Sequence, residues 1–186
     1  ARYRRTVQLK PDHSDAHNNY GVALEELGDV ESAIYEYEQA IRHEPDHAEA
    51  RCNLADLLQS MSRLEESIFH YRKALAVRPD DSDAQNNLGV ALEANGLVDE
   101  AVEAYSKAIA IRSGNWDAQA NLAEALHAKG DLAEAAGVYR LILERDPTDA
   151  HVAASLGNVL HALGRDAEAL EAYSNAVANN PGDAVT

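Results

Sequence analysis

The chain has 186 residues and a formal net charge of −16 at pH 7, and 46% of its residues are hydrophobic while only 5% are aromatic. The negative charge repels phosphate groups, which argues against a nucleic-acid partner. No apolar run is long enough to cross a bilayer, so we expect no membrane partner; the sequence identifies no compartment, and we expect the cytoplasm.

Proline, tyrosine and glycine recur along the chain at intervals of 34 residues. Serine replaces proline once, at Ser113, and replaces glycine once, at Ser62. The recurring residues are Pro11, Pro45, Pro79, Pro147 and Pro181; Tyr3, Tyr37, Tyr71, Tyr105, Tyr139 and Tyr173; and Gly28, Gly96, Gly130 and Gly164. A fixed period of this length indicates that one small structural unit is repeated.

In chain order, residues 1–13 match the second helix of a block whose first helix is missing. Full blocks of 34 residues follow at 14–47, 48–81, 82–115, 116–149 and 150–183, and residues 184–186 begin a further helix. In each block a left-handed glycine is expected to end the first helix, and a proline to end the second. We therefore expect one array of helix hairpins, excised from a longer protein.

Small residues in the first helices predict where the two helices of a block cross. They occupy one column, which holds Gly21, Ala55, Gly89, Ala123 and Gly157. Small side chains allow close approach of two helices, and we expect each tyrosine ring to fill the space beside them.

The 34-residue period, the Leu-Gly columns, the Ala-Tyr-Ala columns and the closing proline together resemble the tetratricopeptide repeat family along essentially the whole chain. The resemblance implies an all-α fold: a right-handed α-solenoid of antiparallel helix hairpins, with five full repeats and a preceding half-repeat. Only the tryptophan that is common early in the first helix is missing, and Gln85 and Gln119 occupy its column. The array is similar to the superhelical repeat arm of O-linked N-acetylglucosamine transferases, which holds extended peptides.

Asparagine recurs in the first helices although it is a mediocre helix former. One column holds Asn19, Asn53, Asn87 and Asn121, with Ser155 last. The resemblance places these helices on the concave wall, where amides can bind a peptide backbone; alternatively, they hydrogen-bond to a neighbouring helix. The predicted peptide-binding residues are Asn18, Asn19, Asn53, Asp56, Asn86, Asn87, Val90, Asn121, Glu124, Ser155 and Asn158.

Acidic residues, Glu25 and Glu93 among them, line the same wall. Those at helix starts, such as Asp15 and Asp83, can be explained by the positive end of the helix dipole. That explanation does not cover Asp56 and Glu124, which lie in the middle of predicted helices. We therefore expect the groove to favour a basic or neutral peptide, with binding that weakens in salt.

Members of the family that bind chaperone tails clamp a C-terminal carboxylate with lysine and arginine. The inner positions here are Asn18, Val22, Asn53, Asp83 and Asn87. A chaperone's acidic C-terminal tail is therefore not an expected partner.

No motif for catalysis, metal binding or cofactor binding is present, so we expect none of these sites and no enzymatic activity in this segment itself. Cys52 is the only cysteine and is expected to be partly buried, and the eight histidines are expected to be exposed or to line the groove. The preferred interpretation is a protein–protein interaction scaffold that binds an extended peptide. The alternatives are the substrate-recruiting arm of a larger enzyme, such as a glycosyltransferase, and self-association by end-to-end stacking.

Overall fold

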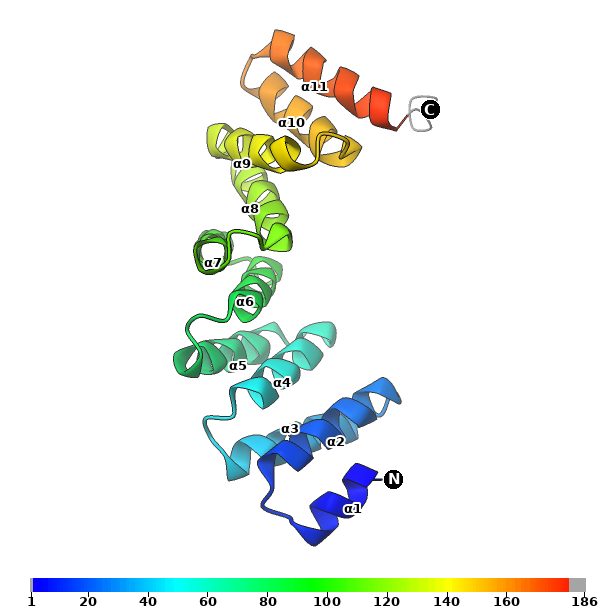
Figure 1. The fold of residues 1–186 in the computed structure, drawn as a ribbon. Helices are drawn as coiled ribbons and strands as arrows, with labels where there is room; N and C mark the ends of the chain where they lie inside the picture. The colour runs from blue at the N-terminus through cyan, green and yellow to red at the C-terminus, as the bar shows by residue number, and fades with distance from the viewer. Residues whose placement is uncertain (1, 181–186) are drawn as a thin grey trace. The chain divides into compact units, whose positions relative to one another are not determined.

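The computed structural model describes residues 2–180, with side chains from residue 5 onward. All regular structure within residues 2–180 is α-helical, which confirms the predicted all-α class of antiparallel helix hairpins (Figure 1). In that range, no helix has both the length and the apolar character needed to cross a membrane. Pro181, the predicted helix start at 184–186 and the side chain of Tyr3 lie outside the described residues.

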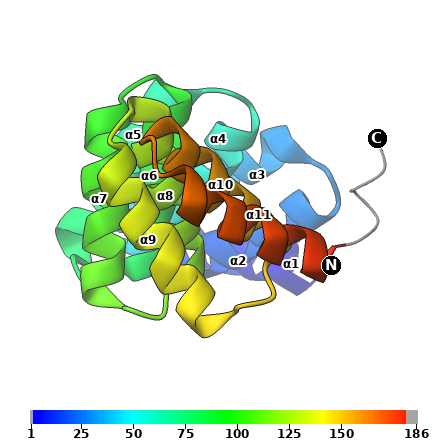
Figure 2. The same cartoon turned by 90° about the horizontal axis from the view of Figure 1, so that it is seen from above.

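The chain divides after Leu97 into two compact units. In each unit, consecutive helices pack against each other as antiparallel neighbours (Figures 1 and 2). In the first unit α4 also contacts α2 and α6, so these three helices form one layer. The helices of the first unit are α1 (Arg2–Leu9), α2 (Ser14–Glu26), α3 (Val30–His43), α4 (Ala48–Ser60), α5 (Leu64–Val77) and α6 (Ser82–Ala94). Those of the second are α7 (Val98–Ile111), α8 (Trp116–Lys129), α9 (Leu132–Arg145), α10 (Ala150–Ala162) and α11 (Asp166–Asn179).

The turns inside the hairpins have the left-handed backbone that the glycine column predicts. Gly28 has φ +77°, and its amide and that of Asp29 donate to the carbonyls of Glu25 and Leu24, both at 2.9 Å. Ser62 adopts the same conformation, with φ +59°, although it carries a side chain. The repeated glycine is therefore required by the turn, and Ser62 is the one strained member of the column.

The tyrosine column fills the space beside the small residues, as predicted. A Cβ atom added to Gly21 would lie 2.6 Å from the Tyr37 ring, and one added to Gly157 would lie 2.5 Å from the Tyr173 ring. The Tyr37 and Tyr71 rings are fully buried. These contacts fix the position of each second helix against the first and direct the tyrosine hydroxyl toward the layer of first helices.

In the blocks at 14–47, 48–81 and 116–149, the column that usually holds tryptophan contains a hydrogen-bond donor instead. Each donor side chain reaches back six residues to a carbonyl in the turn before its helix, which would otherwise lack a helical partner. The pairs are His17 Nε2 to Pro11 O at 2.9 Å, Arg51 Nε and Nη2 to Pro45 O at 2.9 and 2.7 Å, and Gln119 Nε2 to Ser113 O at 2.8 Å. Polar side chains thus fasten the turns between hairpins.

Candidate functional site

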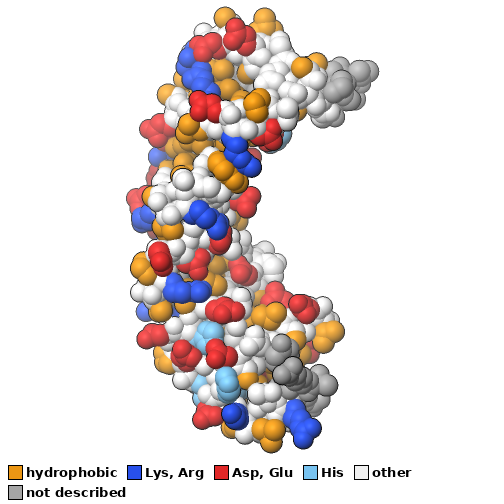
Figure 3. Space-filling model, in the orientation of Figure 1, with side chains coloured by type: hydrophobic (Ala, Val, Ile, Leu, Met, Phe, Trp, Pro, Cys, Tyr) orange, Lys and Arg blue, Asp and Glu red, His pale blue; other side chains and the backbone are white. Residues whose placement is uncertain are grey.

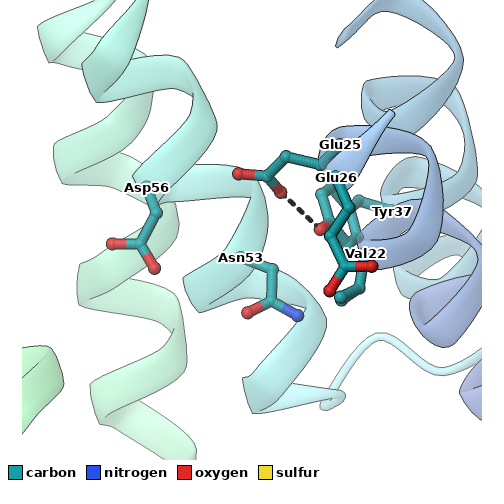
Figure 4. Close-up of a pocket in the computed structure, with 6 residues that line it drawn as sticks. All are labelled: Val22, Glu25, Glu26, Tyr37, Asn53 and Asp56. Atoms are coloured by element: carbon teal, nitrogen blue, oxygen red, sulfur yellow. Dashed lines mark hydrogen bonds between the residues drawn. The ribbon is translucent and has the colours of Figure 1, made fainter. Parts of the chain in front are cut away.

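A pocket of about 370 Å³ opens between α2 and α4 in the first unit (Figure 4). Helix α2 supplies one apolar and two acidic side chains, α3 supplies a tyrosine, and α4 supplies an amide and a third carboxyl group. The lining residues are Val22, Glu25, Glu26, Tyr37, Asn53 and Asp56. The pocket combines an apolar surface with three carboxyl groups and contains no basic side chain among its lining residues.

Tyrosine hydroxyls hold two of these carboxyl groups in place. The Tyr37 hydroxyl donates to Glu25 Oε2 at 2.7 Å, and the Tyr71 hydroxyl donates to Asp56 Oδ1. Burial, followed by the effects of these carboxylates, raises the pKa of both tyrosines above the usual range. The hydroxyls therefore remain donors, and they orient Glu25 and Asp56 without neutralising them.

The Asp56 carboxyl group lines the pocket from α4. It keeps an exposed edge, but the surrounding protein excludes water from much of it, and this burial raises its pKa. Hydrogen bonds from Tyr71 and Asn87 oppose the increase, and the charge of Glu25 adds to it. Hydrogen bonds thus stabilise the negative form of Asp56, and no cation is among the groups that shift its pKa.

The asparagines of the first unit connect successive hairpins. Asn53 Nδ2 donates to Asn18 Oδ1 at 2.9 Å, and Asn18 Nδ2 donates to Glu49 Oε1 at 3.3 Å. Asn87 Nδ2 donates to Asp56 Oδ1 at 3.1 Å. Bonding between repeats, one of the two roles considered for the asparagine column, therefore occurs at Asn53 and Asn87.

The second asparagine column lies behind the first. Asn18 is 2% exposed and Asn86 is 9% exposed, and Asn86 Nδ2 lies 3.4 Å from Asn87 Oδ1 as its donor. These two residues are hydrogen-bonded to Asn53 and Asn87, respectively. Asn19 is exposed on α2 and Val90 is half-buried on α6.

The remaining predicted residues lie in the second unit. On α8, Asn121 is half-buried and Glu124 is exposed. On α10, Ser155 is half-buried and Asn158 is exposed. The Asn158 Oδ1 atom accepts a hydrogen bond of 2.8 Å from the Tyr173 hydroxyl.

Glu124 of the second unit has an ionisable neighbour. Its Oε1 atom lies 3.9 Å from His151 Nε2. Burial and then the charge of Glu124 raise the pKa of Tyr139, which hydrogen-bonds to Ser155. The second unit thus repeats the combination of tyrosine, polar side chain and carboxyl group found in the first.

The pocket brings together two predicted residues, Asn53 and Asp56. The predicted peptide-binding residues do not include Glu25, Glu26 or Tyr37, although Glu25 was expected on the acidic wall. A signal was present, because the doublet Glu25-Glu26 occurs in only one block. The same two columns hold Gln59-Ser60, Glu93-Ala94, His127-Ala128 and His161-Ala162 in the other blocks.

The expectation that every histidine is exposed or lines the groove is wrong for two of them. His17 is 6% exposed and His47 is 8% exposed. His47 ends the turn before α4, where its Nδ1 atom accepts from the Ala50 amide at 3.2 Å. Among the described residues, no group of three or more His, Cys, Asp or Glu side chains could hold a metal ion.

Three models of the tetratricopeptide repeat match the sequence. One matches residues 12–80 and a second matches residues 52–115. The third matches residues 92–159 and 126–185, and these two matches alone span half of the chain. Comparison with curated protein sequences gave no match.

Several solved structures are similar in fold to this chain. YrrB, described as a TPR protein with an unusual peptide-binding site, has a TM-score of 0.87 and 19% identity over 97% of this chain and 93% of its own. A MamA structure has a TM-score of 0.85 and 20% identity over 92% and 93%. PilF of Pseudomonas aeruginosa has a TM-score of 0.71 and 21% identity over 90% and 76%. The repeat models and the hairpins show that the chain belongs to the tetratricopeptide repeat family, whose members are generally non-enzymatic scaffolds for protein–protein interaction.

Proposed function

We propose that the first unit binds an extended peptide across α2 and α4, and that a lysine or arginine side chain of this peptide enters the acidic pocket. The observation that carries the proposal is the pocket itself, with Glu25, Glu26 and Asp56 around about 370 Å³. Val22 offers an apolar surface for the aliphatic stem of the entering side chain.

A cation bound in the pocket would stabilise the negative form of Asp56. Burial and the charge of Glu25 both raise the pKa of Asp56, because its negative form is poorly compensated. A guanidinium or ammonium group between these carboxyl groups would lower that pKa and favour the charged form. Complementary charge of this kind also gives binding that weakens as salt increases.

The amides beside the pocket could contact the peptide backbone. An amide nitrogen carries two protons, so Asn53 has donor capacity beyond the bond it makes to Asn18 in the preceding hairpin. The likeness to YrrB, which has a peptide-binding site, supports the choice of a peptide as ligand. In the second unit, Asn121, Glu124, Ser155 and Asn158 are proposed to contact a peptide in the same way.

The chain is proposed to act by binding alone, with an unidentified protein partner and without catalysis by this segment. Three carboxyl groups would oppose an acidic C-terminal tail at the pocket. The five blocks of 34 residues are retained as the proposed units of the array.

The test is titration of the whole chain with labelled peptides rich in Lys/Arg or in Asp/Glu, at two ionic strengths. The basic set should bind more tightly and lose affinity in salt. Equal affinities that do not respond to salt would reject the acidic pocket as the binding site.

A matched pair of variants locates the site. Glu26→Gln removes one pocket charge and should weaken binding of basic peptides about fivefold, the effect of a modest ion pair. Glu38→Gln removes an exposed charge on α3 that does not line the pocket and should leave affinity unchanged. Equal effects of the two variants would mean that only net charge matters.

A second set of variants tests the amides. Replacing Asn53, Asn87 and Asn121 together by Ala should weaken binding while circular dichroism retains the helical signal. Loss of the helical signal would instead show that the amides act only between repeats.

A further inference from the structure

Two carboxyl groups of the acidic pocket are held by tyrosine hydroxyls from different hairpins. The Tyr37 hydroxyl of α3 donates to Glu25 Oε2 at 2.7 Å. The Tyr71 hydroxyl of α5 and the Asn87 amide of α6 both donate to Asp56 Oδ1. Each carboxyl group therefore has one oxygen atom fixed by the protein. The other oxygen, Glu25 Oε1 or Asp56 Oδ2, receives no hydrogen bond from any described residue.

An apolar residue explains why the Glu25 carboxyl group is held at the pocket. In two other hairpins the tyrosine hydroxyl donates to a polar side chain 15 residues earlier in the chain. These pairs are Tyr71 with Asp56 and Tyr173 with Asn158. Val22 occupies that column in the first block and cannot accept a hydrogen bond. Tyr37 therefore donates to Glu25, 12 residues earlier, and fixes it beside the apolar side chain of Val22.

The fold itself does not require a carboxyl group as the acceptor for these hydroxyls. Asn158 accepts from the Tyr173 hydroxyl at 2.8 Å, and Tyr139 hydrogen-bonds to Ser155. Neutral side chains therefore perform the same structural role in the second unit. The negative charges in the pocket of the first unit exceed what the tyrosines need, and its two unbonded carboxylate oxygens can accept hydrogen bonds from a ligand.

The surface around the pocket does not discriminate between cationic side chains. On the face of the first unit that Figure 3 shows, acidic side chains are spread over the helices, and lysine and arginine side chains are sparse among them. A field of this kind attracts any cation and weakens in salt. Discrimination between lysine and arginine must therefore come from hydrogen bonds made inside the pocket.

The two unbonded oxygens belong to different helices, so a ligand must reach both sides of the pocket. Figure 4 shows Glu25 of α2 and Asp56 of α4 on different sides of the space that they line. A sphere with the pocket's volume of about 370 Å³ is about 9 Å across. An ammonium group donates from one nitrogen atom, and at ~2.9 Å for each hydrogen bond it bridges oxygens less than about 6 Å apart. A guanidinium group donates from separate nitrogens on opposite edges of a plane, so it bridges oxygens that are farther apart.

We propose that the pocket selects arginine over lysine, because the guanidinium group of a peptide arginine bridges Glu25 Oε1 and Asp56 Oδ2. This inference rests on the proposed function, since it names the residue that enters the same pocket. Val22 packs against the aliphatic stem of the arginine. Glu26 also lines the pocket, but no described residue hydrogen-bonds to its carboxyl group and fixes its position. Glu25 and Asp56 therefore determine specificity, and Glu26 adds attraction for either cation.

The first test compares peptides on the unmodified chain and depends on no variant. Short Gly/Ser peptides carry arginine, lysine, asymmetric dimethylarginine or citrulline at one central position, and binding is followed by NMR titration at low salt. Arginine should bind about tenfold more tightly than lysine, the effect of one further hydrogen bond to a charged group. Dimethylarginine keeps the charge but loses two donors, so its affinity should fall to that of lysine. The neutral citrulline should bind most weakly.

The peptide series separates the failure of this inference from the failure of the proposed function. Equal affinities for arginine and lysine, both above that of citrulline, would overturn the selectivity and leave the proposed function standing. If citrulline bound as tightly as the two cations, the proposed function would fail as well.

Two variants and a matched control locate the selectivity in the protein. Glu25→Gln and Asp56→Asn keep an oxygen for the tyrosine hydroxyl but replace the unbonded oxygen by an NH₂ donor. Each should reduce the preference for arginine over lysine from about tenfold to about twofold or less. Glu26→Gln should weaken both peptides and retain the preference. A preference that survives in Glu25→Gln and Asp56→Asn would overturn the proposal.

Discussion

His70 makes the first unit sensitive to acid. This residue lies half-buried on α5, and its Nδ1 atom has no hydrogen-bond partner. Burial lowers its pKa to about 4; the charge of Arg51 acts in the same direction, and Glu66 opposes it weakly. His70 is therefore neutral in the folded protein under conditions where an unfolded histidine is charged.

The sign and size of the effect follow from the two pKa values. Above pH 6.5 neither state binds the proton, so the full stability is present. As the pH falls from 6.5 toward 4, the unfolded state takes up the proton and the folded state does not, so stability is lost. Between pH 7.5 and pH 5.0 the loss attributable to His70 is about 2 kcal/mol.

Urea denaturation of the unmodified chain and of His70→Gln, at pH 7.5 and pH 5.0, measures this contribution. The variant should lose about 2 kcal/mol less than the unmodified chain on acidification. His151→Gln is the control, because the His151 side chain is 81% exposed. This variant should lose as much free energy of unfolding on acidification as the unmodified chain. Because repeat arrays can unfold in parts, hydrogen exchange in α4 and α5 should show the same difference.

If His70→Gln and the unmodified chain lose equal stability between the two pH values, the burial argument for His70 is refuted. A difference that appears equally in the His151→Gln control would mean that net charge, and not the environment of His70, causes the acid sensitivity.

Three further predictions concern packing, backbone and thiol reactivity. Gly21→Ala places a Cβ atom 2.6 Å from the buried Tyr37 ring and should lower the free energy of unfolding in urea by about 1–3 kcal/mol. Gly137→Ala, in the middle of α9, adds a Cβ atom with no other atom within 4 Å and should raise the free energy of unfolding by about 0.5–1 kcal/mol. If both substitutions changed this free energy in the same direction, the packing argument would be contradicted. Ser62→Gly should raise the free energy of unfolding by about 1 kcal/mol, because φ is +59° there, and no gain would show that the turn is unstrained. Burial, and then the charge of Asp81, raises the pKa of Cys52 to about 11, so its reaction with a disulfide reagent at pH 8 should be ~100-fold slower than in urea; similar rates would refute this.

The hairpins could be predicted from the sequence because each turn places the same demand on the backbone. A left-handed turn selects glycine at Gly28, Gly96, Gly130 and Gly164, and the recurrence of this one requirement marks the end of every first helix. The small column opposite the tyrosines has a similar origin, because the ring of Tyr37 leaves no room for a Cβ atom on Gly21. Requirements of this kind are local or repeat at a fixed spacing.

The burial of the histidines could not be predicted in this way. His17 is buried because Glu36, 19 residues away, and the Pro11 carbonyl satisfy its ring nitrogens. His47 is buried as a helix cap, a role more typical of Ser, Thr, Asp or Asn. The burial of His17 depends on specific partners that do not recur. His47 instead shares its column with the N-cap residues His13, Asp81, Asn115 and Asp149, so its role as a cap recurs along the chain.

The pocket was predicted in part for a related reason. Asparagine and Asp56 were found because they lie on the face of the first helices that family resemblance marks as concave. Glu26 was missed because it breaks its column, and a search for recurring residues discards such a position. Glu25, which shares its column with Glu93, was placed on the acidic wall but not among the peptide-binding residues. The chemistry that distinguishes one repeat from the others is carried by residues that do not recur.

Asn53 and Glu26 differ in a way that separates stability from binding. Asn53 lines the pocket and also donates to Asn18 in the preceding hairpin, so its replacement alters both the junction between α2 and α4 and any contact with a peptide. Glu26 lies at the exposed end of α2, where its charge faces the same pocket. Because opposing carboxyl groups repel one another across the pocket, removing the Glu26 charge should leave the fold intact or slightly favour it while weakening a cationic ligand. The ratio of the binding loss to the stability loss should therefore be larger for Glu26→Gln than for Asn53→Ala, and a ratio in the opposite order would place the ligand on the amides instead of the carboxyl groups.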